Sequence, residues 1–128
     1  MRMQLVPTSI SIDLQDSIIR KAVEFADVEI CGVVLKDNSI VYIPNVHPEP
    51  ENFFQMSDES WLTLRDNHGV SGIKGIFHSH PSQGSFPSVT DQEALSAGSY
   101  LLPGWKYWIV TFAGVFEWEF NDLPAINA

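Results

Sequence analysis

The sequence predicts a single α+β domain in which helices alternate with short strands. Its 128 residues are enough for one hydrophobic core and too few for two, and 45% hydrophobic residues support a folded domain over residues 1–128. Near the N-terminus, apolar residues recur every three or four positions, which is typical of a helix. Later apolar runs are short or alternate with polar residues, which is typical of strands. The expected order is helix, two strands, helix, strand, helix and two strands.

The first helix is predicted over Ile12–Ala26, with either Ser11 or Asp13 as its N-cap. Its apolar stripe consists of Leu14, Ile18, Ile19, Ala22, Phe25 and Ala26. The unbroken apolar run Ile30–Leu35 then predicts a central strand, and Ser39–Ile43 predicts the strand that returns beside it.

The middle of the chain is expected to form a loop and a second helix. Pro44–Gln55 is rich in proline and acidic residues and ends in Phe53 and Phe54, so it should be a loop with aromatic anchors that edges the site. Ser57 is expected to cap a helix that continues to about Asp66, and Asn67-His68-Gly69 should end it.

The last third is predicted to hold three strands and a helix. Gly75–Phe77 is expected to be a buried strand, and a helix beginning near Ser88 should end at Gly98. Trp105–Phe112 and Val115–Phe120 are predicted as strands joined at Ala113-Gly114. In the final strand the face formed by Phe116, Trp118 and Phe120 should pack inward, opposite Val115, Glu117 and Glu119.

The composition argues against several classes of partner. Lys and Arg total 7 against 16 Asp and Glu, a net charge of -9, and no basic cluster is present, so nucleic acid and anionic membranes are disfavoured as primary ligands. No apolar run is long enough for a membrane span or a signal peptide. The single Cys31 fits a reducing compartment. We therefore expect a cytoplasmic protein.

Two histidines provide the first indication of a metal site. His78 and His80 follow the predicted strand Gly75–Phe77, and residues two apart on a strand lie on the same face. Both imidazoles can therefore point at one ion while Ser79 points away. Because imidazole is a common ligand of divalent transition metals, the pair predicts a metal site.

Asp91 can supply a third ligand from the start of the next predicted helix. We expect Thr90 and Glu93 to form a capping box there, and the proline-containing loop Pro81–Pro87 to fold the helix back over the strand. Two imidazoles, one carboxylate and an open position for water are typical of a catalytic zinc, although the same ligands suit other divalent ions.

Such a centre also needs a group that moves protons and a donor for developing charge. Glu29 is the candidate general base, while Glu24, Asp27 and Glu93 are competing carboxylates. Ser88 is expected to hydrogen-bond the oxyanion of a cleaved peptide or isopeptide bond. Cys31 is interpreted as a small buried hydrophobic residue, His47 and His68 as exposed or structural, and the late aromatic residues, Tyr107 among them, as core.

The spacing His78-Ser79-His80, seven residues, Ser88-x-x-Asp91 resembles the JAMM, JAB or MPN+ metalloprotease family, whose signature is H-x-H-x7-S-x-x-D. The family's glutamate corresponds to Glu29 in Glu29-Ile30-Cys31-Gly32, and the resemblance covers about residues 10–120. It implies a mixed, mostly antiparallel sheet flanked by helices, like that of cytidine deaminases, together with zinc-dependent hydrolysis.

A narrower similarity is to the N-terminal domain of phage tail assembly protein K. It rests on Asn45-Val46, Pro50-Glu51-Asn52-Phe53 and His78-Ser79-His80-Pro81. Many such proteins carry an additional NlpC/P60 cysteine peptidase domain, which we do not expect in this chain of 128 residues. The chain leaves little room for the insertions with which eukaryotic relatives grip ubiquitin, which argues against ubiquitin itself as the substrate.

Three hypotheses for the function follow. The first is a zinc metallopeptidase acting in phage tail assembly, on a tail protein or on a small ubiquitin-like protein, in the host cytoplasm or on the virion tail. The second is a non-catalytic tail or tail-tip component that binds a partner protein. The third is an enzyme that trims a sulfur-carrier protein.

Overall fold

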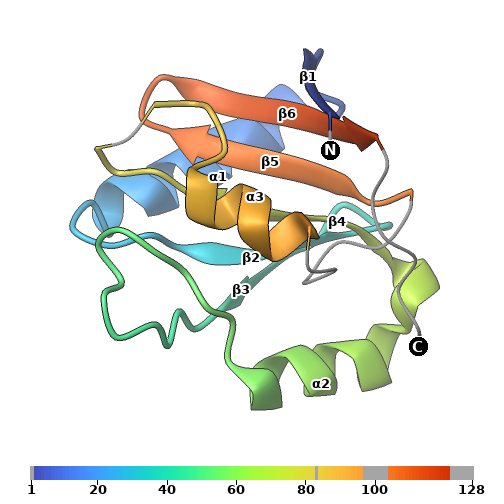
Figure 1. The fold of residues 1–128 in the computed structure, drawn as a ribbon. Helices are drawn as coiled ribbons and strands as arrows, with labels where there is room; N and C mark the ends of the chain where they lie inside the picture. Colours follow the sequence, from blue (N-terminus) through green and yellow to red (C-terminus); the bar gives the residue numbers. More distant parts are fainter. Residues whose placement is uncertain (1, 83, 97–103, 122–128) are drawn as a thin grey trace.

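The computed structural model describes residues 2–82, 84–96 and 104–121. Within these ranges one six-stranded sheet has the order β1-β6-β5-β4-β2-β3. All neighbours are antiparallel except β4 and β5, which are parallel (Figure 1). The strands are β1 (Arg2–Val6), β2 (Cys31–Leu35), β3 (Ile40–Ile43), β4 (Ile73–Ser79), β5 (Lys106–Thr111) and β6 (Gly114–Asn121).

Three α-helices cover the two faces of this sheet in the described residues. They are α1 (Ile12–Glu24), α2 (Asp58–His68) and α3 (Val89–Ser96), and a short 3₁₀ turn, Val70–Gly72, leads from α2 into β4. Figure 1 shows α1 behind the sheet and α3 in front of it, with α2 beside β3. Parallel neighbours such as β4 and β5 need a long crossover connection, and here that connection contains α3.

Each face of the sheet has its own apolar core. On the α1 side, Ile18 and Ala22 pack with Val34, Phe77, Trp108, Val110 and Val115. On the other side, Leu64 of α2 and Leu95 of α3 pack with Val33, Ile76, Tyr107, Ile109 and Trp118. The central strands are therefore apolar on both sides, and a polar residue in β4 is an exception that needs a partner.

Gly32 lets β2 lie close to its two neighbours in the sheet, β3 and β4. A Cβ atom at this position would lie 2.2 Å from the carbonyl oxygen of Val41 in β3 and 2.9 Å from the ring of Phe77 in β4. Both distances are too short for a real contact, so only glycine fits. The packing of the neighbouring strands therefore requires glycine at position 32.

The expected fold class is confirmed, with one strand more than the sequence predicted. β1 was not expected, because Arg2–Val6 has only a weak apolar alternation. It forms the edge of the sheet by pairing with β6, from Leu5 opposite Trp118 to Arg2 opposite Asn121. A partner more than a hundred residues away in the sequence therefore decides its conformation.

The helix starts agree with the prediction more closely than the helix ends. The Ser11 hydroxyl accepts from the Leu14 N–H at 3.3 Å and caps α1, which ends at Glu24, so Phe25 is exposed and lies outside the buried stripe. Ser57 caps α2 as expected. That helix continues to His68, beyond the expected Asp66, and Gly69 ends it at a φ of 68°. The expected stop at Gly98 lies outside the described residues.

The last two strands agree with the prediction except at their turn, which lies one residue earlier, at Phe112-Ala113. Trp118 is buried as expected, but so is Glu117 on the opposite face, which we expected to be the outer one. Here α1 and the segment before it cover the sheet. The Glu117 carboxylate accepts from the Ser9 N–H and from the Trp108 indole, both at 2.9 Å. These hydrogen bonds offset the cost of burying the carboxylate.

None of the helices in the described part of the chain is both long and apolar enough to cross a membrane.

Candidate metal centre

Four buried polar side chains converge at one end of β4, on the face covered by α3. They are Glu29 before β2, His78 in β4, His80 just after β4 and Asp91 in the first turn of α3. The exposed fractions are 2% for Glu29, 0% for His78, 2% for His80 and 8% for Asp91. Burying ionisable groups together costs stability unless they are paired, which makes such a cluster a candidate functional site.

Strand pairing brings Glu29 beside the histidines. Cys31 lies opposite His78 in the antiparallel pair of β2 and β4. The Ile30 N–H donates to the Ser79 hydroxyl at 2.8 Å, and the Ser79 N–H donates to the Ile30 carbonyl at 2.9 Å. Ser79 points away from the histidines, as expected. Its hydroxyl fastens the residue after Glu29 to the strand that carries both imidazoles.

The proline-rich loop supports the same segment from the other side. Asn45 donates to the carbonyl oxygens of Glu29 and Phe53, both at 2.9 Å, and the Glu29 N–H donates to the Pro50 carbonyl at 2.7 Å. Farther along the loop, the Phe54 ring stacks on His78 with centroids 4.3 Å apart and planes 20° from parallel. The expectation that this loop edges the site is confirmed.

Both ring nitrogens of His78 have partners. Nδ1 lies 3.2 Å from Oε1 of Glu29, and Nε2 lies 2.8 Å from the Tyr107 hydroxyl. The same Nε2 is 3.5 Å from Oδ2 of Asp91. A carboxylate at Nδ1 favours the proton on that nitrogen, which leaves the lone pair of Nε2 directed toward Tyr107 and Asp91.

His80 is oriented in the same manner. Its Nδ1 donates to the Gly84 carbonyl at 2.7 Å, which leaves Nε2, 3.2 Å from Oδ2 of Asp91, as the nitrogen that can bind an ion once it has lost its proton. Burial lowers the pKa of His80, but the hydrogen bonds to Asp91 and Gly84 and the nearby carboxylates raise it more, and the net pKa is raised. The imidazole and the Asp91 carboxylate therefore form a charge-stabilised pair when no ion is bound.

Asp91 is held by a reciprocal cap at the start of α3. The Asp91 N–H donates to the Ser88 hydroxyl at 3.0 Å, and the Ser88 N–H donates to Oδ2 of Asp91 at 2.9 Å. The expected capping box of Thr90 and Glu93 is therefore wrong. The actual pair begins two residues earlier, because Ser88 is the residue outside the first turn whose hydroxyl can reach a free N–H. The spacing of Ser88 and Asp91 is that of a helix cap.

The pKa of Asp91 reflects these contacts. Burial raises it, but the charge of His78, the hydrogen bonds from His80 and from the Ser88 backbone, and the charge of His80 lower it to about 2. Asp91 is thus a carboxylate over the whole physiological pH range. An anionic oxygen between two imidazole nitrogens is a suitable donor set for a divalent cation.

The two separations from the Asp91 carboxylate to the histidine nitrogens are close to those around a tetrahedral ion. Ligand atoms about 2.0–2.2 Å from a tetrahedral zinc lie about 3.3–3.6 Å from one another. Oδ2 of Asp91 is 3.2 Å from Nε2 of His80 and 3.5 Å from Nε2 of His78. Glu29, His78 and His80 form an overlapping set whose ligand atoms lie within 4.8 Å of one another. Glu29 faces Nδ1 of His78, whereas Asp91 faces Nε2 of the same ring. The residues present therefore fit a bound divalent ion.

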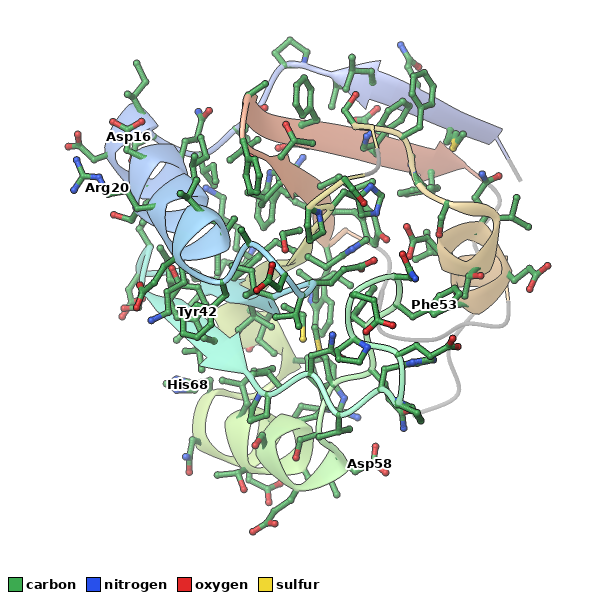
Figure 2. All side chains as sticks on the ribbon, turned by 90° about the vertical axis from the view of Figure 1, so that its left-hand side faces the viewer. Asp16, Arg20, Tyr42, Phe53, Asp58 and His68 are labelled. Carbon is green, nitrogen blue, oxygen red and sulfur yellow. The ribbon has the colours of Figure 1, made fainter. Side chains whose placement is uncertain are left out.

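The competing candidates from the sequence lie elsewhere. Glu24, Asp27 and Glu93 are exposed. His68 is exposed at the C-terminal end of α2, where Figure 2 shows it at the surface. His47 orders the proline-rich loop, with its Nδ1 accepting from the Glu49 N–H at 3.0 Å.

Cys31 behaves as the buried residue that the sequence predicted. Its thiol is 1% exposed and donates to the Ile43 carbonyl at 3.2 Å. Burial and then the charge of Glu29 raise the pKa of the thiol to about 12. A thiol in this state is not a nucleophile at neutral pH.

Two side chains at the centre were not expected to contact the histidines. Tyr107 was interpreted as core and is buried, but its hydroxyl contacts His78. Phe54 was expected only to anchor a loop, yet it stacks on the same imidazole. The parallel pairing of β4 with β5, which sets Ile76 opposite Tyr107, brings the phenol to the site. A local sequence pattern contains no information on that pairing.

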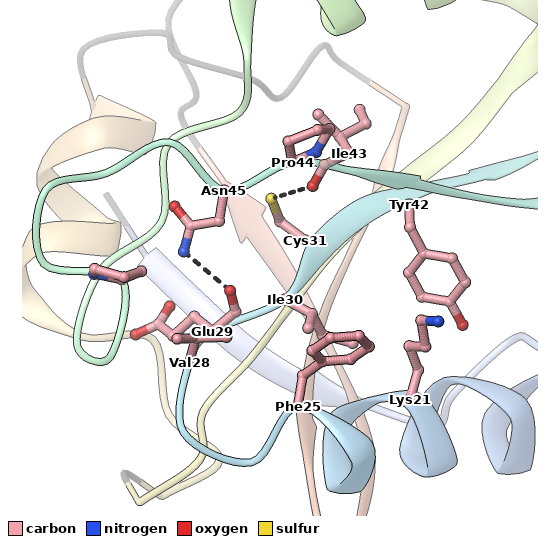
Figure 3. Close-up of a pocket in the computed structure, with 11 residues that line it drawn as sticks. Lys21, Phe25, Val28, Glu29, Ile30, Cys31, Tyr42, Ile43, Pro44 and Asn45 are labelled. Atoms are coloured by element: carbon pink, nitrogen blue, oxygen red, sulfur yellow. Dashed lines mark hydrogen bonds between the residues drawn. The ribbon is translucent and has the colours of Figure 1, made fainter.

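A hollow of about 420 Å³ lies beside Glu29, between the end of α1 and the end of β3. Figure 3 shows it with the Asn45 amide bonded to the Glu29 carbonyl. Its walls are mainly apolar and include Phe25, Val28, Ile30, Tyr42, Pro44 and Pro50. We name it the Glu29 hollow.

These features define the class of protein as an α+β domain that holds a two-histidine, two-carboxylate cluster suited to a divalent ion. Residues 11–121 match the family described as prokaryotic homologs of the JAB domain, and the chain belongs to that family. The resemblance seen in the H-x-H and S-x-x-D motifs is thereby confirmed at the level of the family.

One relative and one solved structure are similar to this chain. The chain is 30% identical to a desampylase of Haloferax volcanii over 133 aligned positions, which cover 90% of this chain and 92% of the relative. It is also similar to the solution structure of protein DSY2949 from Desulfitobacterium hafniense, with a TM-score of 0.60 and 23% identity over 80% of this chain and 73% of that one. The second similarity supports the fold alone.

Proposed function

We propose that this chain is a zinc-dependent isopeptidase that releases a small ubiquitin-like protein from a protein target. The observation that carries the proposal is the convergence of Glu29, His78, His80 and Asp91 in one buried cluster. The name of the haloarchaeal relative, desampylase, denotes the removal of a ubiquitin-like modifier, and that relative matches almost the whole chain. The cluster supports metal-dependent hydrolysis, and the name of the relative favours an isopeptide bond over other amide bonds.

His78, His80 and Asp91 would hold the ion through Nε2, Nε2 and Oδ2. When bound, zinc supplies Lewis acidity to a carbonyl oxygen and lowers the pKa of water to near neutrality. The protein's part is to present the two nitrogen lone pairs in the right tautomers. The Glu29 carboxylate and the Gly84 carbonyl do this, because each accepts from the Nδ1–H of one imidazole.

Glu29 is proposed as the general base and then the general acid. It would take the proton of the attacking water and return it to the leaving lysine amine. Its position supports this role, since the carboxylate is buried and the backbone around it is held by Pro50, Asn45 and Ser79. A base that is fixed in this manner does not need to reorganise during the reaction.

Ser88 is proposed to stabilise the oxyanion. Its oxygen accepts from the Asp91 N–H, and this bond leaves the hydroxyl proton available for a substrate oxygen. The capping bond thus orients the hydroxyl that would donate. Helix capping and oxyanion binding are compatible roles for one serine.

The Glu29 hollow is proposed to receive the substrate beside the base. Its mainly apolar walls favour an apolar side chain of the modifier or of the target. Lys21 lies at one side, with its ammonium 5.0 Å from the centroid of the Phe25 ring and 5.4 Å from that of Tyr42. The positive charge of this ammonium would attract a substrate carboxylate at that side of the hollow.

The experiment uses a reporter in which a peptide ending in Gly-Gly is joined to the ε-amine of a lysine. Zinc-loaded protein should cleave it, a chelator should stop cleavage, and Glu29→Gln and His80→Ala should each reduce kcat by at least about a hundredfold. His68→Ala is the matched control, since His68 is exposed and outside the cluster. Wild-type rates in either cluster variant would refute the mechanism, and a zinc content near zero after expression with added zinc would refute the metal centre.

A role in phage tail assembly stays a prediction that depends on the loop motifs Asn45-Val46 and Pro50-Glu51-Asn52-Phe53. The same holds for a tail component without activity and for the trimming of a sulfur-carrier protein. Tail proteins and small proteins ending in Gly-Gly are therefore the natural substrates to test after the reporter.

A further inference from the structure

Tyr107 carries a hydroxyl group into the cluster that the proposed mechanism does not use. Its side chain extends from β5 on the face that also carries Ile109 and is fully buried. The ring meets the edge of Phe120 at a centroid distance of 5.1 Å. The hydroxyl oxygen is 2.8 Å from Nε2 of His78. Core packing explains the position of the ring, but a phenylalanine would pack there as well.

The hydrogen-bond pattern of His78 fixes the direction of this contact. Nδ1 faces the carboxylate of Glu29, which can only accept, so in the neutral form of His78, the form that binds metal, the ring proton lies on Nδ1. In that form Nε2 has a lone pair and no proton, and the Tyr107 O–H is the donor. The acceptor is the same nitrogen that faces Asp91 in the spacing of a metal ligand.

We propose that the Tyr107 hydroxyl caps the metal-binding nitrogen of His78 in the metal-free protein and that an entering ion must displace it. This inference rests on the ligand assignment in the proposed function. One lone pair cannot accept a hydrogen bond and bind an ion at the same time. Tyr107 is therefore a positioning residue. It keeps His78 in the tautomer that binds metal, and it satisfies a buried nitrogen that would otherwise lack a partner.

The two states of the site respond differently to the loss of this hydroxyl. In the metal-free protein, Tyr107→Phe leaves the lone pair of His78 buried without its donor, so this state is destabilised. In the metal-bound protein the ion already occupies the lone pair of His78, so the same substitution destabilises this state less. Zinc should consequently bind the variant about three- to tenfold more tightly than the wild type. A purely structural role would destabilise both states equally, and a role as a metal ligand would weaken binding.

Two measurements on the full chain test this inference, and neither depends on cleavage. The first is competition titration of zinc against a chromophoric chelator, and the second is thermal unfolding with and without zinc. Tyr107→Phe should show the lower Kd and a larger rise in Tm on adding zinc. Ser71→Ala is the control and should match the wild type in both, because Ser71 is exposed in the 3₁₀ turn before β4, away from the cluster.

The outcomes separate this inference from the proposed function. An unchanged or higher Kd in Tyr107→Phe, with zinc still bound by the wild type, overturns the inference and leaves the isopeptidase proposal intact. If the wild type binds no zinc, both are overturned. A variant that folds only when loaded with zinc supports the inference, because it shows that the hydroxyl stabilises the metal-free state.

Discussion

Ser79→Ala tests whether one hydroxyl holds the proposed base in place. Ser79 is 1% exposed, and its hydroxyl accepts the Ile30 N–H at 2.8 Å, next to Glu29. Alanine leaves that N–H without its partner, which costs about 1–3 kcal/mol. With an unfolding entropy of about 0.27 kcal/mol/K for 128 residues, Tm should fall by about 4–11 °C.

The effect on catalysis should exceed the effect on folding. A misplacement of a reacting group by about 1 Å can cost about a hundredfold in rate, so kcat of the Gly-Gly-lysine reporter should fall at least about tenfold at a temperature where the variant is fully folded. Zinc affinity should change little, since His78 and His80 keep their other contacts. Thermal unfolding, zinc titration and steady-state kinetics measure the three quantities.

The control for this variant is Ser71→Ala, which removes a hydroxyl from an exposed residue of the 3₁₀ turn before β4 and should leave all three quantities unchanged. Loss of stability with an unchanged kcat would refute the idea that Ser79 positions Glu29. An unchanged Tm would refute the hydrogen-bond argument itself.

Two further predictions concern the other side of the centre. Ser88→Ala should destabilise the protein by about 0.5–2 kcal/mol because it removes the cap of α3, and it should lower kcat about a hundredfold or more, whereas Ser88→Thr should restore stability. Urea unfolding measures the stability and reporter kinetics measure kcat. A wild-type kcat in the alanine variant would rule out the oxyanion role. The pKa of His80 is raised above 6.5, so its contribution to metal-free stability is fully present below about pH 6.5 and is lost as the pH rises through the higher folded-state value. Because zinc requires neutral His80, zinc affinity should fall steadily as the pH drops below that value, and equal affinities at pH 5 and pH 8 would contradict the role of His80 as a ligand.

The sequence alone was sufficient to find the residues proposed as metal ligands. His78 and His80 are two apart on a strand, and the structure has their rings adjacent, with centroids 4.8 Å apart. Ser88 and Asp91 are three apart at a helix start, where a reciprocal cap fixes both. Local geometry determines such pairs, and so their spacing in the sequence carries the information. The helix starts at Ser11 and Ser57 were predictable for the same reason.

Tertiary structure decided which residues far away in the sequence contact the proposed metal ligands. The sequence favoured Glu29 by its position at a strand start but left Glu24 and Asp27 as competing carboxylates. The pairing of Cys31 with His78 brings Glu29 to the cluster. The burial of Glu117 likewise depends on the segment that leads into α1. These outcomes depend on sheet order and register, which no local pattern encodes.

Tyr107 shows the same limit most clearly. As an aromatic residue of a predicted strand it was expected in the core, and it is buried. Whether a buried phenol meets an apolar side chain or an imidazole depends on the parallel register of β5 against β4, which is set across a connection that contains α3. The sequence determined the chemistry available at each position, and the pairing of strands far apart in the chain determined which of those groups can touch.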